Sequence, residues 1–516
     1  MSSQLIIASL AVSSVSAVTI HGTKSSYLTE IKDQSDLLPF LAGAAPYFSY
    51  PLGENYYKIN TSIPDICTLR QVQVLARHGE RYPGTSEGNK LIQLYNTKFA
   101  NLSKSDLADN EYFNFLVDPT YQFFLPDNSS LELLTTTDDS LTGALNPYAG
   151  ELTAMKFGKE FTKKYKDLIG DTLPIFTASN SRVYETAKYF SSIINKYLGS
   201  NINMQVLNEL QKTGGNSLTP SETCDVWDFP VHQDIVDAMD TTYLVNLASR
   251  LNNATDGLNL TSEEASLLFD WCAYEIDVSG YSPICEIFTQ EELVLHAFSD
   301  DLSSYYSDGP GNPLVKSVGS VFFNSTIELL KNPPKEYSAY IGFTHDVNTQ
   351  HMMAAVGLFD TNELMDSKFD YRNTIYKKSW ITPMGARVIL ENYECWNSSY
   401  VRYVVNDAVV PIQDCNQGPG FSCGLNEFYN YAESRLSNIT AFENACNITN
   451  LPTYQSFYWD YQNVNYTAPI AVQSYWVHVI SESMYCFLII SYKTWCDFFV
   501  FVGTSLYNIH VHVKVD

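Results

Sequence analysis

Residues 69–83 read LRQVQVLARHGERYP, and this stretch decides the fold class. Residues 69–76 form an apolar, strand-like run that leads directly into a polar turn beginning at Arg77. The same order of strand-like run, polar turn and helical pattern recurs after residues 173–178 and after residues 337–343. Strands that alternate with helices predict an α/β protein built on a sheet.

Each of the three predicted strands delivers charged or titratable residues to its carboxyl end. In open α/β sheets, the ligand crevice lies just beyond these ends. The residues in question are Arg77 with His78, Arg182, and His345 with Asp346. We therefore expect these side chains to converge, although the strand order that would bring them together is not visible in the sequence.

The chain changes character between about residues 201 and 331. Helical patterns over residues 234–251 and 262–275, after a polar entry at residues 212–221, predict a mainly helical insertion. The predicted organisation is a signal peptide (1–17), an N-terminal extension (18–63), an α/β domain in two parts (64–200 and 331–466), the helical insertion (201–330) and an atypical tail (467–516).

The charge of the chain excludes one class of partner. Its 516 residues carry 31 Lys and Arg against 57 Asp and Glu, a formal net charge of -26 at pH 7. Such a chain repels polyanions, so nucleic acid is not an expected partner. The apolar stretch at residues 484–502 is interrupted by Lys493 and Asp497, so no stable membrane span is predicted. Whether the chain forms a homo-oligomer is left open.

Several features predict secretion to the extracellular space, the cell wall or a periplasmic space. Residues 5–12 are apolar and Val15-Ser16-Ala17 fits a signal-peptidase site, so we expect cleavage after Ala17. Ten N-x-S/T sequons predict N-glycosylation. They begin at Asn60, Asn101, Asn128, Asn253, Asn259, Asn324, Asn397, Asn438, Asn447 and Asn465. Ten cysteines in an oxidising compartment predict disulfides, whose pairing spacing alone does not decide.

A serine-hydrolase pattern, G-x-S-x-G, occurs at residues 84–88. A nucleophile elbow needs its serine on a tight turn directly between a strand and a helix. Here seven residues, including Pro83, separate the pattern from the predicted strand that ends at Ala76. We interpret the segment as a loop rather than as the site of a nucleophilic Ser86.

His78 between Arg77 and Arg81 has three possible uses. The segment could be an exposed turn with surface salt bridges, or the arginines could capture phosphate in a binding protein without turnover. In the third use, His78 is the nucleophile of phosphoryl transfer. Imidazole attacks only when neutral, and nearby guanidinium groups lower its pKa while they neutralise the phosphoryl oxygens.

A leaving alkoxide needs a proton, and His345-Asp346 is the candidate for supplying it. Asp346 would donate the proton, and His345 would donate a hydrogen bond to a phosphate oxygen. Taken alone, the dipeptide also fits a helix N-cap aspartate beside a packed histidine. A metal site made of His345, Asp346 and His351 is a further alternative, but the spacing matches no standard zinc motif.

These residues resemble those of the histidine acid phosphatase family, in particular the secreted fungal acid phosphatases and phytases. Residues 77–83 are similar to the family signature RHGxRxP, and Thr344-His345-Asp346 to its HD element. Residues 150–153 with Gly158, and Arg182 with residues 185–187, resemble intermediate family segments. The similarity covers about residues 64–466.

The resemblance implies a fold with a central mixed sheet flanked by helices and a second, mainly helical domain. It implies His78 as nucleophile, Asp346 as proton donor, and no metal or other cofactor. The phosphoryl oxygens would be held by Arg77, Arg81, Arg182 and His345. Disulfides would join Cys67 with Cys395, Cys224 with Cys446, Cys272 with Cys285, and Cys415 with Cys423, while the resemblance does not cover Cys486 and Cys496.

The substrate is expected to be a small phosphate monoester. A phytase must hold several phosphate groups, so Lys or Arg should surround its pocket. After the signature the chain offers only Lys90 and Lys98, with Glu87 among them. We therefore expect a broad acid phosphatase, with phytase as the alternative.

Overall fold

The computed structural model describes residues 33–50, 59–139, 145–224, 226–227, 231–360, 363–368, 371 and 374–471. It also describes the backbone of residues 486–487, 495–502 and 505–512. The predicted signal peptide lies outside the described residues, as do the side chains of Cys486 and Cys496. The chain divides into two units, one ending at Ala471 and one beginning at Val472.

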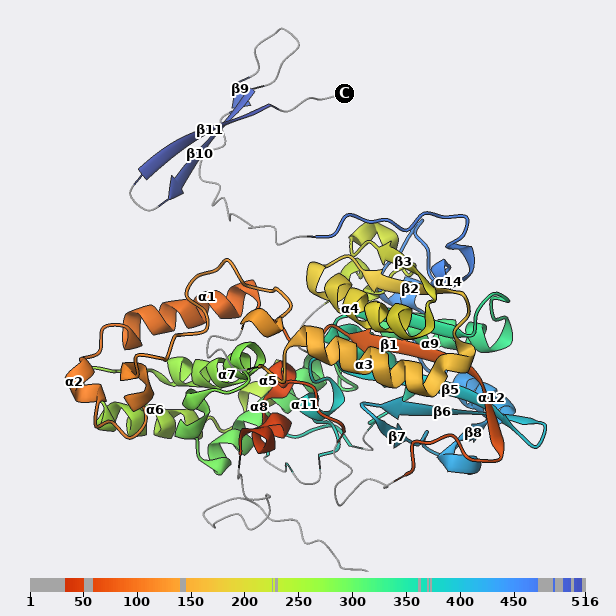
Figure 1. Ribbon diagram of the computed structural model, residues 1–516, viewed down its shortest axis with the longest axis horizontal. Helices are drawn as coiled ribbons and strands as arrows, with labels where there is room; N and C mark the ends of the chain where they lie inside the picture. The colour runs from red at the N-terminus through yellow and green to blue at the C-terminus, as the bar shows by residue number, and fades with distance from the viewer. Residues whose placement is uncertain are drawn as a thin grey trace, which may run out of the picture. The chain divides into compact units, whose positions relative to one another are not determined.

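A mixed sheet of eight strands forms the centre of the first unit, and this confirms the predicted fold class (Figure 1). Its order is β3-β2-β4-β1-β5-β6-β7, with β8 paired to β6. The strands are β1 (Cys67–Arg77), β2 (Thr172–Ala178), β3 (Asn201–Leu207), β4 (Ala339–Thr344), β5 (Arg387–Cys395), β6 (Ser398–Val405), β7 (Ala408–Val410) and β8 (Cys423–Gly424). Neighbouring strands from β3 to β1 are parallel, whereas β5 is antiparallel to β1 and to β6.

Helices cover both faces of the sheet. The side chains of Gln71 and Gln73 in β1 donate to main-chain carbonyls of α9 (Pro313–Lys331). On the opposite face, Phe343 of β4 packs against Phe190 of α4 (Ser181–Leu198), with ring centroids 5.2 Å apart. Gly319 allows α9 to approach α10 (Asp346–Val356), because a Cβ atom there would lie 1.9 Å from the carbonyl oxygen of His351. Helix α10, which carries Asp346, is thereby fixed against the sheet.

A second group of helices lies beside the sheet (Figure 1). It includes α1 (Thr85–Leu94), α2 (Lys104–Leu107), α5 (Gln233–Asp237), α6 (Thr242–Ala254), α7 (Ser262–Ser279) and α8 (Gln290–Ser307). The prediction of a single helix over residues 234–251 is wrong, because two separate helices, α5 and α6, occupy this range. Between them the carboxylate of Asp240 accepts the N–H of Thr242, a local bond that competes with helix continuation.

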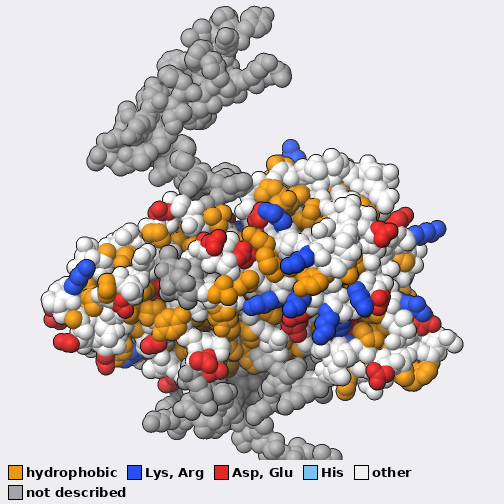
Figure 2. Space-filling model, in the orientation of Figure 1, with side chains coloured by type: hydrophobic (Ala, Val, Ile, Leu, Met, Phe, Trp, Pro, Cys, Tyr) orange, Lys and Arg blue, Asp and Glu red, His pale blue; other side chains and the backbone are white. Residues whose placement is uncertain are grey.

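The first unit contains five further α-helices among the described residues. They are α3 (Gly150–Tyr165), α11 (Lys378–Ile381), α12 (Leu425–Leu436), α13 (Phe442–Ala445) and α14 (Phe457–Asp460). Exposed lysines gather over α3 on the face that Figure 2 shows. No described helix is long and apolar enough to cross a membrane.

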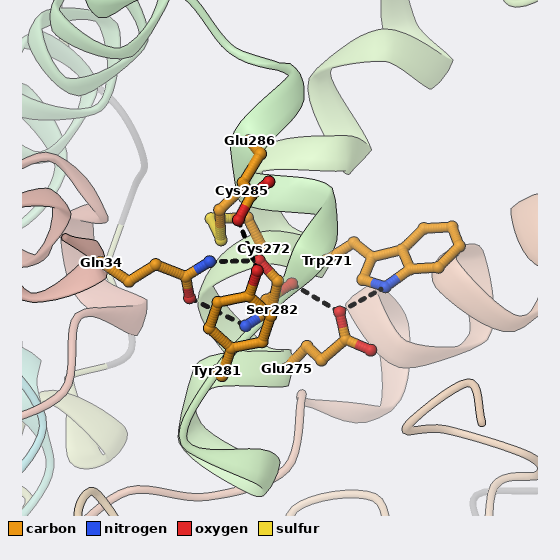
Figure 3. Close-up of a disulfide and its surroundings, with 8 residues drawn as sticks. All are labelled: Gln34, Trp271, Cys272, Glu275, Tyr281, Ser282, Cys285 and Glu286. Carbon is orange, nitrogen blue, oxygen red and sulfur yellow. Dashed lines mark hydrogen bonds between the residues drawn. A yellow bond between two sulfur atoms is a disulfide. The ribbon is translucent and has the colours of Figure 1, made fainter. Parts of the chain in front are cut away.

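The N-terminal extension is bound to the helical part near a disulfide (Figure 3). Gln34 donates to the carbonyl of Ser282 at 2.6 Å and accepts its N–H at 2.9 Å. Close by, the buried carboxyl of Glu275 accepts hydrogen bonds from the side chains of Trp271 and Ser282. The segment that follows Gln34 is therefore held against the helices that surround the candidate site.

The described part of the chain contains four disulfides, the same pairs that the family resemblance implies. They join Cys67 with Cys395, Cys224 with Cys446, Cys272 with Cys285, and Cys415 with Cys423. The first joins residues that face each other in the β1–β5 ladder. The second unit contains an antiparallel sheet of β9 (Cys486–Phe487), β10 (Trp495–Val502) and β11 (Ser505–His512).

Candidate active site

Parallel pairing brings the ends of β1, β4 and β2 to one edge of the sheet. Arg77 pairs with Thr344 across β1 and β4, and Phe343 pairs with Thr177 across β4 and β2. The residues that follow these strands therefore meet: the rings of His78 and His345 have centroids 5.8 Å apart. The convergence expected from the strand ends is confirmed, and the strand order β2-β4-β1 is its cause.

The His78 ring is buried, with 1% of the residue exposed, and its tautomer follows from one contact. Its Nδ1 atom lies 2.8 Å from the carbonyl oxygen of Gly79, which only accepts, so Nδ1 carries the proton. The Nε2 atom then carries a lone pair. Burial lowers the pKa of His78 well below its usual value, and the charges of Arg182, Arg77 and Arg81 lower it further. The imidazole is therefore neutral even in acid.

Three arginines surround this imidazole, and each is fixed by main-chain or side-chain acceptors. Arg77 donates to the carbonyls of Gly43 and Thr382, both at 2.7 Å. Arg81 donates to the Tyr82 carbonyl, and Arg182 donates to Glu132 and Asn180, both at 3.1 Å.

Each arginine also keeps one buried donor without a partner. The Nε atoms of Arg77, Arg81 and Arg182 are buried and have no hydrogen-bond partner among the described residues. Buried donors are nearly always satisfied in folded proteins, so three such groups around one imidazole indicate a place for an anion. Guanidinium groups match the oxygens of phosphate in particular.

His345 and Asp346 stand at the start of α10. His345 is the N-cap residue, and Asp346 is the first residue of the helix. The Asp346 carboxylate lies 3.4 Å from a guanidinium nitrogen of Arg77. Burial raises the pKa of Asp346, but Arg77, Lys378 and Arg81 outweigh burial and hold this pKa far below its usual range. The side chain is therefore ionised.

Two segments singled out in the sequence pack directly on the RHGERYP turn. The Gly79 N–H donates to the hydroxyl of Thr186 in α4 at 3.0 Å. Gly150, at the start of α3, allows close approach because a Cβ atom there would lie 2.3 Å from the Glu80 carbonyl oxygen. Thr153 then donates to the buried Glu80 carboxyl at 2.9 Å. Both segments therefore hold the turn that carries His78.

A cavity of about 200 Å³ opens onto Arg77, Arg81 and Asp346. Its other charged or titratable side chains belong to Glu87, Asp270, Tyr274, His296, Asp300 and Lys378, and residues 40–44 of the N-terminal extension complete the wall. Ser86 is exposed at the start of α1 and does not line the cavity. The only residue of the G-x-S-x-G pattern that lines it is Glu87.

The lysines expected at the pocket do not line it. Neither Lys90 nor Lys98 is among the lining residues, and Lys98 instead pairs with Glu264 at 3.0 Å. Lys378, from α11, takes a position in the wall that no sequence pattern indicated. His351, the third residue of the metal alternative, is buried with its Nε2 atom 3.4 Å from Asp308. The described residues contain no cluster of three or more side chains suited to a metal ion.

Sequence patterns also missed the residues that hold the site in place. Glu209 lies 2.8 Å from His345, and Glu132 lies 3.1 Å from Arg182. The carbonyls of Gly43 and Thr382 orient Arg77. An isolated carboxylate or carbonyl gives no local signal, although Glu209 does follow a fourth strand-like run, residues 201–207.

The chain is similar to known proteins over most of its length. The family model described as the histidine phosphatase superfamily (branch 2) matches residues 68–406. A constitutive acid phosphatase of Saccharomyces cerevisiae is 41% identical over 470 residues, which are 90% of this chain and 98% of the relative. A phytase of Candida albicans is 38% identical over 443 residues, covering 85% of this chain and 93% of the relative. The crystal structure of a phytase from D. castellii superposes with a TM-score of 0.77 at 36% identity, covering 88% of this chain and 98% of that one.

Proposed function

The chain belongs to branch 2 of the histidine phosphatase superfamily, and from this membership and the site geometry we propose how it works as an acid phosphatase. The reaction is the hydrolysis of phosphate monoesters in two steps, through a phosphohistidine. The observation that carries the proposal is the neutral His78, whose Nε2 lone pair is free for attack, among three arginines that each bury an unpartnered donor.

In the first step, Nε2 of His78 attacks phosphorus and the bond from phosphorus to the ester oxygen breaks. Arg77, Arg81, Arg182 and His345 hold the other phosphoryl oxygens. Asp346 protonates the leaving oxygen. In the second step, water attacks the phosphohistidine, Asp346 takes a proton from it, and phosphate leaves His78 with its lone pair restored.

Asp346 must gain a proton before it can donate one, since Arg77, Lys378 and Arg81 keep it ionised. A bound phosphoryl group brings negative charge to Arg77 and Arg81 and offsets this effect. The affinity of Asp346 for a proton therefore rises when substrate binds, which ties the donor role to the loaded site and to acidic solution.

A test of the covalent step is brief reaction at acidic pH with a labelled monoester, followed by quenching in base. Phosphohistidine is stable in base and labile in acid, so label on a peptide containing His78 is the expected result. The variant His78→Ala should retain no label, and Ser86→Ala should label normally. Label on Ser86 would overturn the proposal, and so would binding of phosphate without any turnover, the behaviour of a phosphate-binding protein.

The preferred substrate is a simple monoester, with phytate as the second candidate. The cavity wall carries the carboxyl groups of Glu87 and Asp300 against one lysine, Lys378, which disfavours a substrate with several phosphates. The similarity to phytases at 36% and 38% identity favours the second candidate. The ratio of kcat/KM on phytate to kcat/KM on a simple monoester, measured across acidic pH, distinguishes the two.

We also propose that the protein is secreted. All ten sequon asparagines are exposed, which the attachment of a glycan requires. Four disulfides suit an oxidising compartment. Mass spectrometry of protein collected from the culture medium should find glycans at these sequons and a mature N-terminus after Ala17.

A further inference from the structure

Glu209 follows a fourth strand, β3, and contacts His345 at the site. It lies two residues beyond Leu207, the last residue of β3, and 21% of its side chain is exposed. One carboxylate oxygen, Oε2, lies 2.8 Å from Nε2 of His345. The other, Oε1, accepts the main-chain N–H of Asn180 at 2.5 Å. The carboxylate therefore binds two segments that carry groups of the phosphate site.

Glu209 also acts on the position of Arg182, through Asn180. Asn180 is the N-cap of α4, and its side-chain oxygen accepts the N–H of Arg182 at 3.3 Å and a guanidinium N–H of Arg182 at 3.1 Å. Glu209 thus fixes the residue that orients Arg182 at the same time as it fixes His345.

The contact with His345 determines which ring nitrogen faces the phosphate site. A carboxylate only accepts, so Nε2 of His345 carries a proton and Nδ1 is the nitrogen left for other partners. Nδ1 lies 3.4 Å from Nη2 of Arg182, which is long for a hydrogen bond. A phosphoryl oxygen placed against both nitrogens could accept from each of them, provided that Nδ1 also carries a proton.

The Glu209 carboxylate is ionised in acid. Burial raises its pKa, but the hydrogen bond and charge of His345, the Asn180 N–H and Arg182 outweigh burial and lower it. An ionised carboxylate is a strong acceptor for the Nε2–H of His345. The charged or titratable groups around His345 are Glu209 after β3, Arg182 from α4, His78 after β1, and Asp346 next in the chain.

We propose that Glu209 is a positioning residue of the phosphatase reaction. It holds His345 through Nε2 and Arg182 through Asn180, so that Nδ1 of His345 and Nη2 of Arg182 face the same phosphoryl oxygen. This inference rests on the proposed function.

The test is a double-mutant cycle between Glu209 and His345, measured as kcat/KM for a simple monoester in the full-length protein. Glu209→Gln keeps the size of the side chain and removes its charge. We expect kcat/KM to fall about ten- to hundredfold, the effect of losing a hydrogen bond to a charged group. This loss should become much smaller in a His345→Ala background, because the residue that Glu209 positions is then already missing. Glu209→Asp, which keeps a carboxylate that can accept from Nε2, should recover part of the activity.

Glu132→Gln is the matched control. It removes a carboxylate that lies 3.1 Å from the same Arg182 guanidinium, but Glu132 has no hydrogen bond or ion pair with His345 among the described residues. This variant should lose kcat/KM by a similar factor in the wild-type and His345→Ala backgrounds. A Glu209→Gln effect that is equally large in both backgrounds, or a Glu132→Gln effect that disappears with His345, would overturn the inference. A wild-type protein without phosphatase activity would instead overturn the proposed function.

Discussion

The Nδ1 atom of His78 lies 2.8 Å from the carbonyl oxygen of Gly79, the next residue in the chain. This contact uses the proton of the neutral imidazole and leaves the Nε2 lone pair for attack. Burial and three arginines then keep the ring neutral as the pH falls. The position of His78 and its protonation state therefore both follow from the turn after β1 and from the strand order that brings Arg182 beside it.

The acid limb of kcat/KM should lie well below pH 6.5, because the lowered pKa of His78 keeps the ring neutral there. Among the charges around His78, Arg182 lowers its pKa most. Removing this charge in Arg182→Gln makes the imidazolium less unfavourable, so the acid limb should move to higher pH. Activity should fall about 10²- to 10³-fold, since a donor to the phosphoryl group is lost.

The control for this prediction is Arg250→Gln. The Arg250 guanidinium binds Glu292 at 2.7 Å in the helical part of the protein, away from the cavity wall. Its acid limb should coincide with that of the wild type. An Arg182→Gln limb at the wild-type position would mean that the guanidinium does not set the protonation state of His78.

Asp346→Asn should separate good leaving groups from poor ones. The amide cannot supply the proton that an alkoxide needs, so kcat for an alkyl phosphate should fall about 10²- to 10⁴-fold. A nitrophenolate leaves without a proton, so kcat for nitrophenyl phosphate should fall much less. Steady-state rates on both substrates check this. Asp300→Asn, which changes another carboxylate of the cavity wall, should affect both esters alike.

The sequence predicted those parts of the molecule that local pattern determines. The strand-like runs at residues 69–76, 173–178 and 337–343 correspond to β1, β2 and β4 to within a few residues. The groups that follow them converge as expected. This succeeded because the strands are buried and because chemistry in such folds collects at strand ends.

Partners that lie far apart in the chain could not be predicted in this way. Arg77 depends on the carbonyls of Gly43 and Thr382, and His345 depends on Glu209, which is 136 residues away. Main-chain carbonyls carry no sequence identity at all. Lys378 was missed for the same reason, since it reaches the cavity from α11, far along the chain from the signature at residues 77–83.

Gly150→Ala should displace the turn that carries His78, the proposed nucleophile. A Cβ atom at this position would lie 2.3 Å from the Glu80 carbonyl oxygen and 2.7 Å from a methyl carbon of Leu134. Overpacking of this kind costs about 1–3 kcal/mol of stability. Because Glu80 is two residues from His78, kcat should also fall. Chemical denaturation and kcat on one monoester give both quantities.

The control for the glycine prediction is Gly170→Ala. A Cβ atom there meets nothing closer than 3.8 Å, and the position has no left-handed backbone. This variant should have wild-type activity and equal or slightly higher stability. A Gly150→Ala protein with wild-type activity and stability would show that the turn can shift away from α3 without consequence.

Glu275→Gln should change how stability depends on pH. Burial raises the pKa of Glu275 from 4.5 to about 7, although the side chains of Ser282, Tyr121 and Trp271 lower it in part. Between these two pH values the folded protein keeps a proton that the unfolded chain has released. Stability therefore falls as pH rises from about 4.5 to 7, by about 3 kcal/mol at most for this residue.

Glutamine resembles the protonated acid at every pH, so Glu275→Gln should flatten this fall. Free energies of unfolding for the variant and the wild type, measured at pH 5 and pH 7, provide the check. Glu80, Asp270 and Asp301 also have raised pKa values, to about 7, 8 and 7, so some loss of stability with pH should remain in the variant. An unchanged slope would mean that Glu275 is already ionised in the folded protein at pH 5. The three donors around it would then be binding a carboxylate rather than a carboxylic acid.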